Sequence, residues 1–241
     1  MGLSPGKLLV VIPAFNEESS VGDVVKEVKA FLPYASCLVV DDGSSDKTSE
    51  IARTAGATVA RLPFNLGVGG ALRLGFRYAK DNNFDTVVQI DADGQHDPRE
   101  VPRLLEELAH ADLVIGARFS GKGDYQVGGA RKLAMIAMSR ILSATSHVKL
   151  NDTTSGFKAS GSRAIELFAE SLPAEYLGDT IEALVIASRA QLKIAQVSVT
   201  MRKRQAGTPS HNPFKASVYL LRAIVALVVA LIRPRTHPQK M

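Results

Sequence analysis

Short apolar runs alternate along the chain with longer stretches in which apolar residues recur at the spacing of a helix. The runs that predict strands are Leu8–Ile12, Leu38–Val40, Thr58–Leu62, Thr86–Ile90, Leu113–Ile115 and Ile194–Thr200. Helical patterns follow the first strand to about residue 32 and then cover about residues 46–55, 70–80 and 98–109. Strands that alternate with helices in this way are typical of βαβ units. We therefore expect an α/β fold with a mostly parallel central sheet flanked by helices.

Two acidic residues, Asp91 and Asp93, directly follow the predicted strand Thr86–Ile90. While the chain stays extended, side chains two residues apart point the same way, and a parallel sheet binds ligands at the carboxyl ends of its strands. Such a pair suits Mg²⁺ or Mn²⁺, which take one or two carboxylates and fill the other positions with water and substrate phosphates. Gln95 can add a neutral oxygen. The alternative is that both acids are ordinary turn residues.

A second acidic pair, Asp41 and Asp42, follows the predicted strand Leu38–Val40. A carboxylate there can accept hydrogen bonds from a nucleobase or from ribose hydroxyls. A plain strand-to-helix turn accounts for the Gly-Ser-Ser that follows, but poorly for two adjacent acids. The first strand also ends in polar residues, Asn16 and Glu17, so three strand ends bring polar groups to one edge of the sheet.

The helix predicted after the Asp91 motif has a clear start. Asp97 can cap it, Pro98 suits the first helical position, and Glu100 completes a capping-box-like pair. His96 is close enough to the acids to touch a site there. No two of the five histidines have metal-ligand spacing, so a capping or surface role is the interpretation we favour for His96.

The glycine-rich turn at residues 65–70 resembles a dinucleotide-binding fingerprint only superficially. That fingerprint requires glycine where Leu72 stands, and it follows the first strand of a sheet, whereas this turn follows the third. An oxidoreductase is therefore not predicted. The backbone N–H groups of the turn are still expected near donor phosphates.

Composition and charge indicate where the protein works. The net charge of +5 is uneven: residues 183–241 carry ten Lys or Arg and no acid, which leaves residues 1–182 at −5. A basic end on an acidic body indicates an anionic partner. Aromatic residues are 6% of the chain and tryptophan is absent, which disfavours nucleic acid. The single cysteine, Cys37, lies in an apolar run and is expected to be buried.

An apolar stretch near the C-terminus, residues 216–232, is interrupted only by Ser217 and Arg222. A 17-residue helix spans about 26 Å, short of a hydrocarbon core of about 30 Å. We expect a helix that lies on or partly in an anionic membrane surface or packs on a partner, either a second copy or a small membrane protein; the alternative is a last core helix. The domains are then a catalytic unit at 1–212 and a hydrophobic, basic tail at 213–241. With no secretory signal, the cytoplasmic face of the membrane is expected, as a peripheral or monotopic protein.

Taken together, the motifs resemble those of the family 2 glycosyltransferases, in particular the dolichol-phosphate mannose synthase-like branch, which acts on polyprenyl phosphates. The matching stretches follow the order of that family and cover nearly the whole domain: Val11–Glu18, Val39–Thr48, Asn65–Ala71, Gln89–Pro98, Ile115–Phe119, Asp152–Ala159 and Met201–Gly207. The resemblance implies a GT-A fold, Rossmann-like, and a hexosyltransferase that uses a nucleotide-diphosphate sugar.

The resemblance also implies roles for individual residues. The nucleotide pocket would be lined by Pro13, Phe15, Glu17, Asp41 and Asp42, and the metal and diphosphate site would consist of Asp91, Asp93 and Gln95. Phosphate-binding basic residues would be Arg118, Arg131 and Arg204. Arg131 would bind the acceptor phosphate, while Arg118 and Arg204 would stabilise charge on the departing diphosphate.

The sequence is compatible with two classes of acceptor and with one non-enzymatic role. A polyprenyl phosphate attacks with an anionic oxygen and needs no base, whereas a hydroxyl acceptor requires one, for which Asp179 is the best candidate. Both transfers would invert the anomeric carbon. The Gly-Asp-Thr-Ile-Glu sequence at 178–182 departs from the lipid-phosphate branch. An inactive nucleotide-sugar-binding scaffold on the membrane is the third hypothesis. Neither the nucleobase nor the sugar follows from the sequence.

Overall fold

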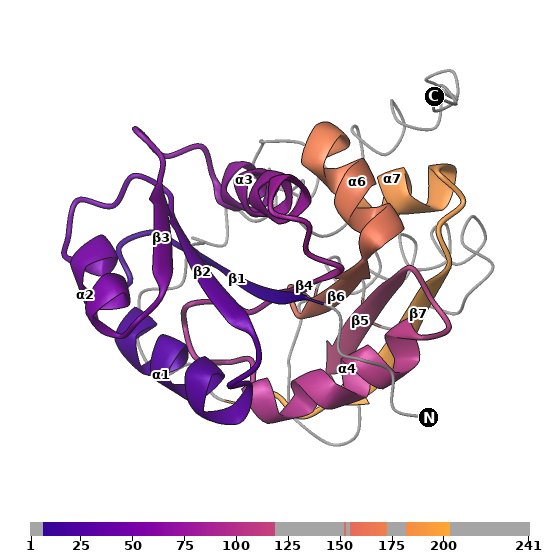
Figure 1. Ribbon diagram of the computed structural model, residues 1–241, viewed down its shortest axis with the longest axis horizontal. Coiled ribbons are helices and arrows are strands. Elements are labelled where there is room, and N and C mark those ends of the chain that lie inside the picture. Colours follow the sequence, from indigo (N-terminus) through magenta and orange to yellow (C-terminus); the bar gives the residue numbers. More distant parts are fainter. Residues whose placement is uncertain (1–6, 119–151, 153–154, 173–181, 203–241) are drawn as a thin grey trace, which may run out of the picture.

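The computed structural model of the protein describes residues 7–118, 152, 155–172 and 182–202 (Figure 1). The strands are β1 Leu8–Ala14, β2 Ser36–Asp41, β3 Thr58–Arg61, β4 Thr86–Gln89, β5 Leu113–Arg118, β6 Lys158–Gly161 and β7 Ile194–Val199. The helices are α1 Val21–Phe31, α2 Thr48–Thr54, α3 Val68–Asp81, the 3₁₀ turn η1 Pro98–Glu100, α4 Val101–Leu108, α6 Ser162–Ser171 and α7 Ala183–Arg189.

The strands form one sheet in the order β3-β2-β1-β4-β6-β5-β7. Strands β1 to β4 run parallel to one another, β5 and β7 run parallel, and β6 is antiparallel to both of its neighbours, β4 and β5. The mostly parallel α/β sheet predicted from the sequence is confirmed. The sequence predicts only one strand after residue 118, Ile194–Thr200, and this was wrong. The structure has a second strand there, β6, which pairs with β4 and β5 inside the sheet.

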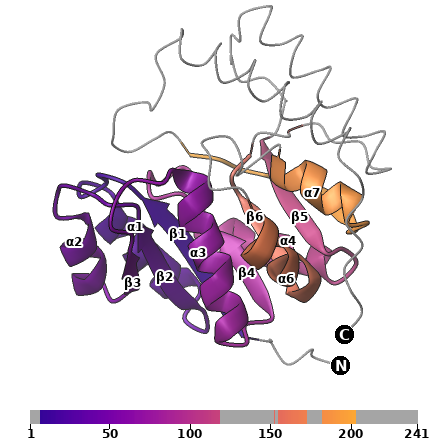
Figure 2. The same cartoon turned by 90° about the horizontal axis from the view of Figure 1, so that it is seen from above.

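Helices cover both faces of the sheet, so the molecule has three layers. Helices α1, α2 and α4 lie on one face and α3, α6 and α7 on the other (Figure 1), where α3 and α6 lie side by side (Figure 2). Each side of the sheet has its own apolar core, and β1 alternates between them, with Leu9 and Val11 in one and Val10 and Ile12 in the other. Burial on both faces explains why this strand is a continuous apolar run.

The register of the central strands aligns their carboxyl ends. Ala14 at the end of β1 pairs with Asp41 at the end of β2, and Val11 pairs with Gln89 at the end of β4. Asp41 and the residues just after Gln89 therefore flank β1 at one edge. Because neighbouring strands lie about 4.8 Å apart, the backbones of β2 and β4 are roughly 10 Å apart there, so one extended ligand can contact both.

Several predicted features fall outside the described residues. These are the hydrophobic helix expected at 216–232, and with it the tail 213–241. Within the ranges that the structure describes, no helix is long and apolar enough to cross a membrane. Cys37 is buried as expected, and burial raises the pKa of its thiol to about 12, so it is not a nucleophile at neutral pH.

Candidate active site

Asp41 closes β2 and holds the loop that follows it. Its Oδ1 accepts the N–H of Ser44 at 2.8 Å, its Oδ2 accepts the hydroxyl of Ser49, and Arg61 Nε lies 3.7 Å from Oδ2. Burial acts to raise the pKa of this carboxyl, but the hydrogen bonds from Ser44 and Ser49, helped by the charge of Arg61, outweigh it and lower the pKa. Asp41 is therefore a charged group, 1% exposed, that fixes the backbone of the edge.

Asp42 fixes a different loop. Its two oxygens accept the N–H groups of Leu66 and Gly67 at 2.7 and 2.8 Å, and Gly67 caps α3 with a φ of 85° that favours glycine. Burial, with a smaller effect from the charge of Asp41, raises the pKa of Asp42 above its usual value despite these bonds. Of the backbone N–H groups in this turn that were expected near donor phosphates, those of Leu66 and Gly67 are thus already bonded to Asp42.

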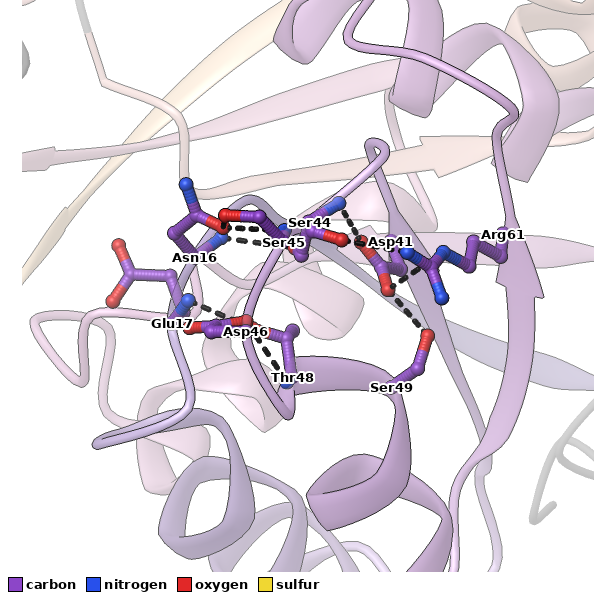
Figure 3. Close-up of polar contacts among 9 residues, drawn as sticks. All are labelled: Asn16, Glu17, Asp41, Ser44, Ser45, Asp46, Thr48, Ser49 and Arg61. Atoms are coloured by element: carbon purple, nitrogen blue, oxygen red, sulfur yellow. Dashed lines mark hydrogen bonds and ion pairs between the residues drawn. The ribbon is translucent and has the colours of Figure 1, made fainter.

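The loops after β1 and β2 bond to each other through Asn16 (Figure 3). Asn16 has a φ of 54°; its N–H donates to Ser44 Oγ at 2.9 Å, and its Oδ1 accepts the N–H of Ser45 at 2.9 Å. Positive φ is uncommon outside glycine, and asparagine tolerates it better than most residues. Asn16 therefore matches this bend in backbone conformation and in side-chain bonding, which keeps the two strand ends in a fixed relation.

Glu17 lies in the same loop network. Its N–H donates to Thr48 Oγ1 at 2.9 Å, and its carboxylate accepts the hydroxyl of Ser20 at 2.8 Å. Phe15 precedes this network with 44% of its surface exposed, whereas Pro13 pairs with Val40 inside the sheet. Of the residues assigned to the nucleotide pocket, Phe15 is the one that presents a large apolar surface at the edge.

Asp91 stands on the other side of β1 and has a more open environment. Its side chain is 38% exposed, and its Oδ1 accepts a bond from Gln89 Nε2 at 3.3 Å. The imidazole of His96 accepts the Asp91 N–H at Nδ1, at 3.0 Å, and places Nε2 3.6 Å from Asp91 Oδ2. A Cβ on Gly156 would come within 3.0 Å of Oδ2, so the segment before β6 touches the carboxylate.

The chain turns after Asp91, so the extended geometry assumed for the acidic pair does not hold. Strand β4 ends at Gln89, Ala92 and Asp93 lie in a turn, and Gly94 has a φ of 76°. Asp93 Oδ1 accepts the N–H of Gln95 at 3.0 Å. The structure brings the three predicted ligands into one tight turn, by folding the chain back and not by alternation along a strand.

The turn is held from behind by the chain that follows β7. His96 forms a β-bridge with Met201, and the Arg202 N–H donates to the Gln95 carbonyl at 2.9 Å. Arg202 also pairs through its side chain with Asp97 at 2.8 Å and with Glu27 of α1 at 2.6 Å. Through these contacts the segment that follows β7 is joined to the acidic turn and to α1.

Asp97 is the predicted cap, and it caps a 3₁₀ turn. Its side chain accepts the Arg99 N–H at 3.0 Å, and α4 begins only after η1. Burial acts to raise the pKa of Asp97, but hydrogen bonds from Arg99 and Arg202 outweigh it and the pKa is lowered. Asp97 is thus a charged anchor directly behind the acidic turn.

Four of the predicted basic and catalytic residues cannot be placed as side chains. Arg131, Asp179 and Arg204 lie outside the described residues, and Arg118 is described only by its backbone, which ends β5 and pairs with Val199. In the described part of the chain, no group of three or more His, Cys, Asp or Glu side chains could hold a metal by itself.

Comparison with known proteins identifies the family. Residues 9–164, more than half of the chain, match the family described as "Glycosyl transferase family 2". The chain is a family 2 glycosyltransferase. The resemblance seen in its motifs is confirmed, and the inactive-scaffold hypothesis gives way to an enzyme.

Relatives of this glycosyltransferase span nearly its whole length. An undecaprenyl-phosphate mannosyltransferase of Micrococcus luteus is 32% identical over 210 residues, which cover 83% of this chain and 86% of the relative. A dolichyl-phosphate hexose transferase of Haloferax volcanii is 29% identical over 220 residues, 90% of this chain and 92% of that protein.

Solved structures show the same fold. The glucosyl-3-phosphoglycerate synthase of Mycobacterium tuberculosis, in complex with Mn²⁺, uridine diphosphate and glucosyl-3-phosphoglycerate, has a TM-score of 0.71 and 27% identity, covering 95% of this chain and 81% of its own. The same enzyme has also been solved with Mg²⁺ and uridine diphosphate, at a TM-score of 0.71 and 26% identity, covering 95% of this chain and 80% of its own. The GT-A fold predicted for the glycosyltransferase is confirmed.

Sequence reasoning missed several contributors to the site of this glycosyltransferase. His96 was expected as a capping or surface residue, yet it is 4% exposed and lies against Asp91. Neither hydrophobic patterning nor residue type indicates a role for Gly156 or Arg202, although both lie in stretches that match the family. Their place in those matching stretches is the signal that could have pointed to them.

Proposed function

We propose that this glycosyltransferase moves a sugar from a nucleotide-diphosphate sugar to a polyprenyl phosphate with inversion at the anomeric carbon. The observation that carries the acceptor is the similarity, over more than four fifths of both chains, to relatives named for undecaprenyl-phosphate and dolichyl-phosphate transfer. The edge of the sheet supports the assignment of a nucleotide-sugar donor. The loops after β1 and β2 are bonded to each other on one side of β1, and the partly exposed Asp91 carboxylate lies on the other side.

The donor would lie across the end of β1. The nucleoside would contact the loops that Asp41 and Asn16 hold together, with the exposed ring of Phe15 as an apolar contact. Asp41 is 1% exposed and its two oxygens already accept from Ser44 and Ser49, so it would act on the nucleoside by holding this loop in place. The diphosphate would then reach the turn that begins at Asp91.

The acidic turn fits a divalent ion that is completed by substrate. Asp91 offers a carboxylate that is 38% exposed, and Asp93, which is 8% exposed, and Gln95 would add oxygen ligands from the same turn. Hard cations such as Mg²⁺ and Mn²⁺ use one or two protein carboxylates and take their other ligands from phosphates and water. When bound, Mg²⁺ or Mn²⁺ would neutralise charge on the donor diphosphate. Asp91, Asp93 and Gln95 are the residues that would hold it.

The remaining roles belong to basic residues. Arg118 and Arg204 would bind the departing nucleoside diphosphate, and Arg131 the acceptor phosphate, because guanidinium groups bind phosphate in a bidentate way. Arg202, two residues before Arg204, is bonded to the acidic turn, so the chain enters that segment beside the donor site. No general base is required, since a phosphate oxygen is already anionic at neutral pH.

A lipid-phosphate acceptor would be reached at a membrane surface. The basic residues of the tail 213–241, among them Arg233 and Arg235, would bind anionic lipid on the cytoplasmic face, each contributing about 1 kcal/mol when close to the surface. We propose that residues 213–241 form the membrane-binding unit and 1–212 the catalytic unit. A second copy or a small membrane protein is the alternative partner of the apolar stretch.

A hydroxyl acceptor is the second candidate, and one observation favours it. The matching solved synthase binds glucosyl-3-phosphoglycerate, a small-molecule product, and 95% of this chain is covered by that match. In that case Asp179 would act as the base that removes the hydroxyl proton. The two candidates differ in whether Asp179 is needed for transfer.

The deciding experiment compares both acceptors in the full-length protein. Nucleotide sugars are screened with Mn²⁺ by thermal shift, and the stabilising donor is then offered with undecaprenyl phosphate in vesicles or with 3-phosphoglycerate in solution. We expect transfer to the lipid, and Asp179→Asn to retain it. Transfer to 3-phosphoglycerate alone, abolished by Asp179→Asn with donor binding intact, would overturn the lipid proposal.

Membrane binding is tested with charge changes in the full chain. Arg233→Gln combined with Arg235→Gln should weaken sedimentation with anionic vesicles and weaken transfer to the lipid, more at low salt than at high salt. The matched control is Lys26→Gln with Arg53→Gln, two exposed positions on the acidic body. Equal losses in both double variants would argue against a basic tail that docks the enzyme.

A further inference from the structure

We propose that His96 is a positioning residue that sets the orientation of the Asp91 carboxylate, and through it the affinity of the acidic turn for a divalent cation. This inference rests on the proposed function only for the role of Asp91 as a ligand. The contacts that carry it are all among described residues and belong to three separate parts of the chain.

One edge of the imidazole ring faces Asp91. Nδ1 accepts the Asp91 backbone N–H at 3.0 Å, so the proton of the neutral ring is on Nε2. Nε2 in turn lies 3.6 Å from Asp91 Oδ2. His96 therefore contacts both the backbone and the carboxylate of Asp91. These contacts restrain the position of the Asp91 backbone and the orientation of its carboxylate.

The ring of His96 is itself held firmly. It is 4% exposed and stacks on the fully buried ring of Phe157, with centroids 4.9 Å apart and planes 14° from parallel. Its backbone forms a β-bridge with Met201. A ring packed on one face by an aromatic side chain, and anchored at its backbone by an isolated β-bridge, cannot turn away from Asp91 without disrupting the core.

The other sides of the carboxylate are closed by different residues. Gln89 Nε2 donates to Oδ1 at 3.3 Å, and a Cβ at Gly156 would lie 3.0 Å from Oδ2 and 3.2 Å from Oδ1. The Asp91 side chain nevertheless remains 38% exposed. His96, Gln89 and Gly156 thus enclose the carboxylate and leave one open side, toward solvent, where a cation can approach.

A ligand held in one orientation binds a cation more tightly, because its rotamer freedom is lost on folding and not on binding. Groups behind a metal ligand that orient it typically change affinity by about 10–100-fold when removed. We therefore expect loss of the two ring nitrogens of His96 to weaken cation binding by about that factor, with no change in the nature of the ligands.

Three substitutions separate the two nitrogens from the ring stack. His96→Phe keeps a ring on Phe157 but removes both nitrogens. His96→Asn places an oxygen where Nδ1 accepts the Asp91 N–H, and His96→Gln places an amide nitrogen near the position of Nε2. His110→Phe, at an exposed position on α4's carboxyl side, controls for loss of a histidine as such.

Binding of Mn²⁺ is measured on full-length protein by electron paramagnetic resonance, with uridine and guanosine diphosphate each tested at saturation. We expect His96→Phe to raise the Mn²⁺ dissociation constant about 10–100-fold, His96→Asn and His96→Gln to fall between it and wild type, and His110→Phe to match wild type. Turnover at saturating Mn²⁺ should recover to within about threefold of wild type in the Asn and Gln variants.

The outcomes distinguish this inference from the proposed function. Asp91→Asn is measured beside the histidine variants. If Asp91→Asn loses Mn²⁺ binding but all folded His96 variants bind within about twofold of wild type, His96 does not position the carboxylate and only this inference is overturned. If Asp91→Asn binds Mn²⁺ normally, both the cation site and the inference are refuted. Should His96→Phe fail to fold, the Asn and Gln variants decide in the same way.

Discussion

Replacing Arg202 by alanine should destabilise the whole domain, because this side chain joins three distant parts of the chain. Its guanidinium bonds Asp97 behind the acidic turn and Glu27 on α1, at 2.8 and 2.6 Å, and only 21% of the side chain is exposed. Both partners belong to the first hundred residues, whereas Arg202 lies shortly after β7. The two ion pairs of Arg202 therefore connect the first hundred residues of the domain to the segment that follows β7.

The size of the effect follows from what each partner retains. Hydrogen bonds to charged groups contribute about 1.5–3 kcal/mol, and breaking a fully buried ion pair costs about 3–5 kcal/mol. Asp97 keeps its bonds from Arg99, and Glu27 is 35% exposed and can be hydrated, so neither is left as an isolated buried charge. We expect a loss of about 2 kcal/mol, which lowers the melting temperature of a domain of this size by about 4–8 °C.

Thermal unfolding followed by circular dichroism at pH 7 measures this loss. Arg202→Lys should recover part of it, because lysine keeps the charge but not the bidentate geometry. Lys26→Ala is the control: its ion pair with Asp23 is about 70% exposed on both sides, so the melting temperature should hold within about 1 °C. If Arg202→Ala also melts within about 1 °C of wild type, the idea that these ion pairs stabilise the domain is refuted.

Three further changes test the site and its electrostatics. Asp93→Asn should abolish Mn²⁺-dependent transfer with the fold intact, and near-normal turnover in saturating Mn²⁺ would contradict its role as a ligand. Arg204→Ala should lower kcat about 10²-fold, more than it changes donor affinity; an effect on KM alone would indicate uniform binding. The pKa of Asp97 and that of Asp41 are lowered from 3.8, so the stabilisation that these charged carboxylates provide is present above about pH 4 and is lost as the pH falls below it. Urea unfolding at pH 3–6 should therefore show that the free energy of unfolding falls less on acidification in Asp97→Asn than in wild type.

Most of the sheet could be predicted from the sequence because its strands are buried on both faces. Such strands are unbroken apolar runs, and the runs found at 8–12, 38–40 and 86–90 all lie within or beside observed strands. Strand β6 could not be found in this way, since Lys158–Gly161 reads Lys-Ala-Ser-Gly and has one apolar residue. Its place is determined by pairing with β4 and β5, which are tertiary contacts.

The site was predicted in its residue types but not in its internal bonding. The sequence indicated acids at the ends of β2 and β4, yet it could not show that Asp42 bonds the turn before α3 or that His96 lies against Asp91. Both contacts depend on backbone turns, at Gly67 and Gly94, that no periodicity encodes. Hydrophobic periodicity identifies elements, whereas the bonding at their ends depends on the conformation of a few residues between them.

The antiparallel strand β6 has a consequence for the order in which the chain can fold during synthesis. Strands β1 to β4 pair among themselves, so that half of the sheet can assemble once the ribosome has released the chain to Gln89. Strand β5 pairs with β6 and β7, and the first residue of β6 lies 40 residues beyond Arg118. A growing chain therefore carries β5 with both edges open for the time that those residues take to be translated. Unpaired strand edges invite association with other chains, so we expect the nascent enzyme to be most prone to aggregation during this interval.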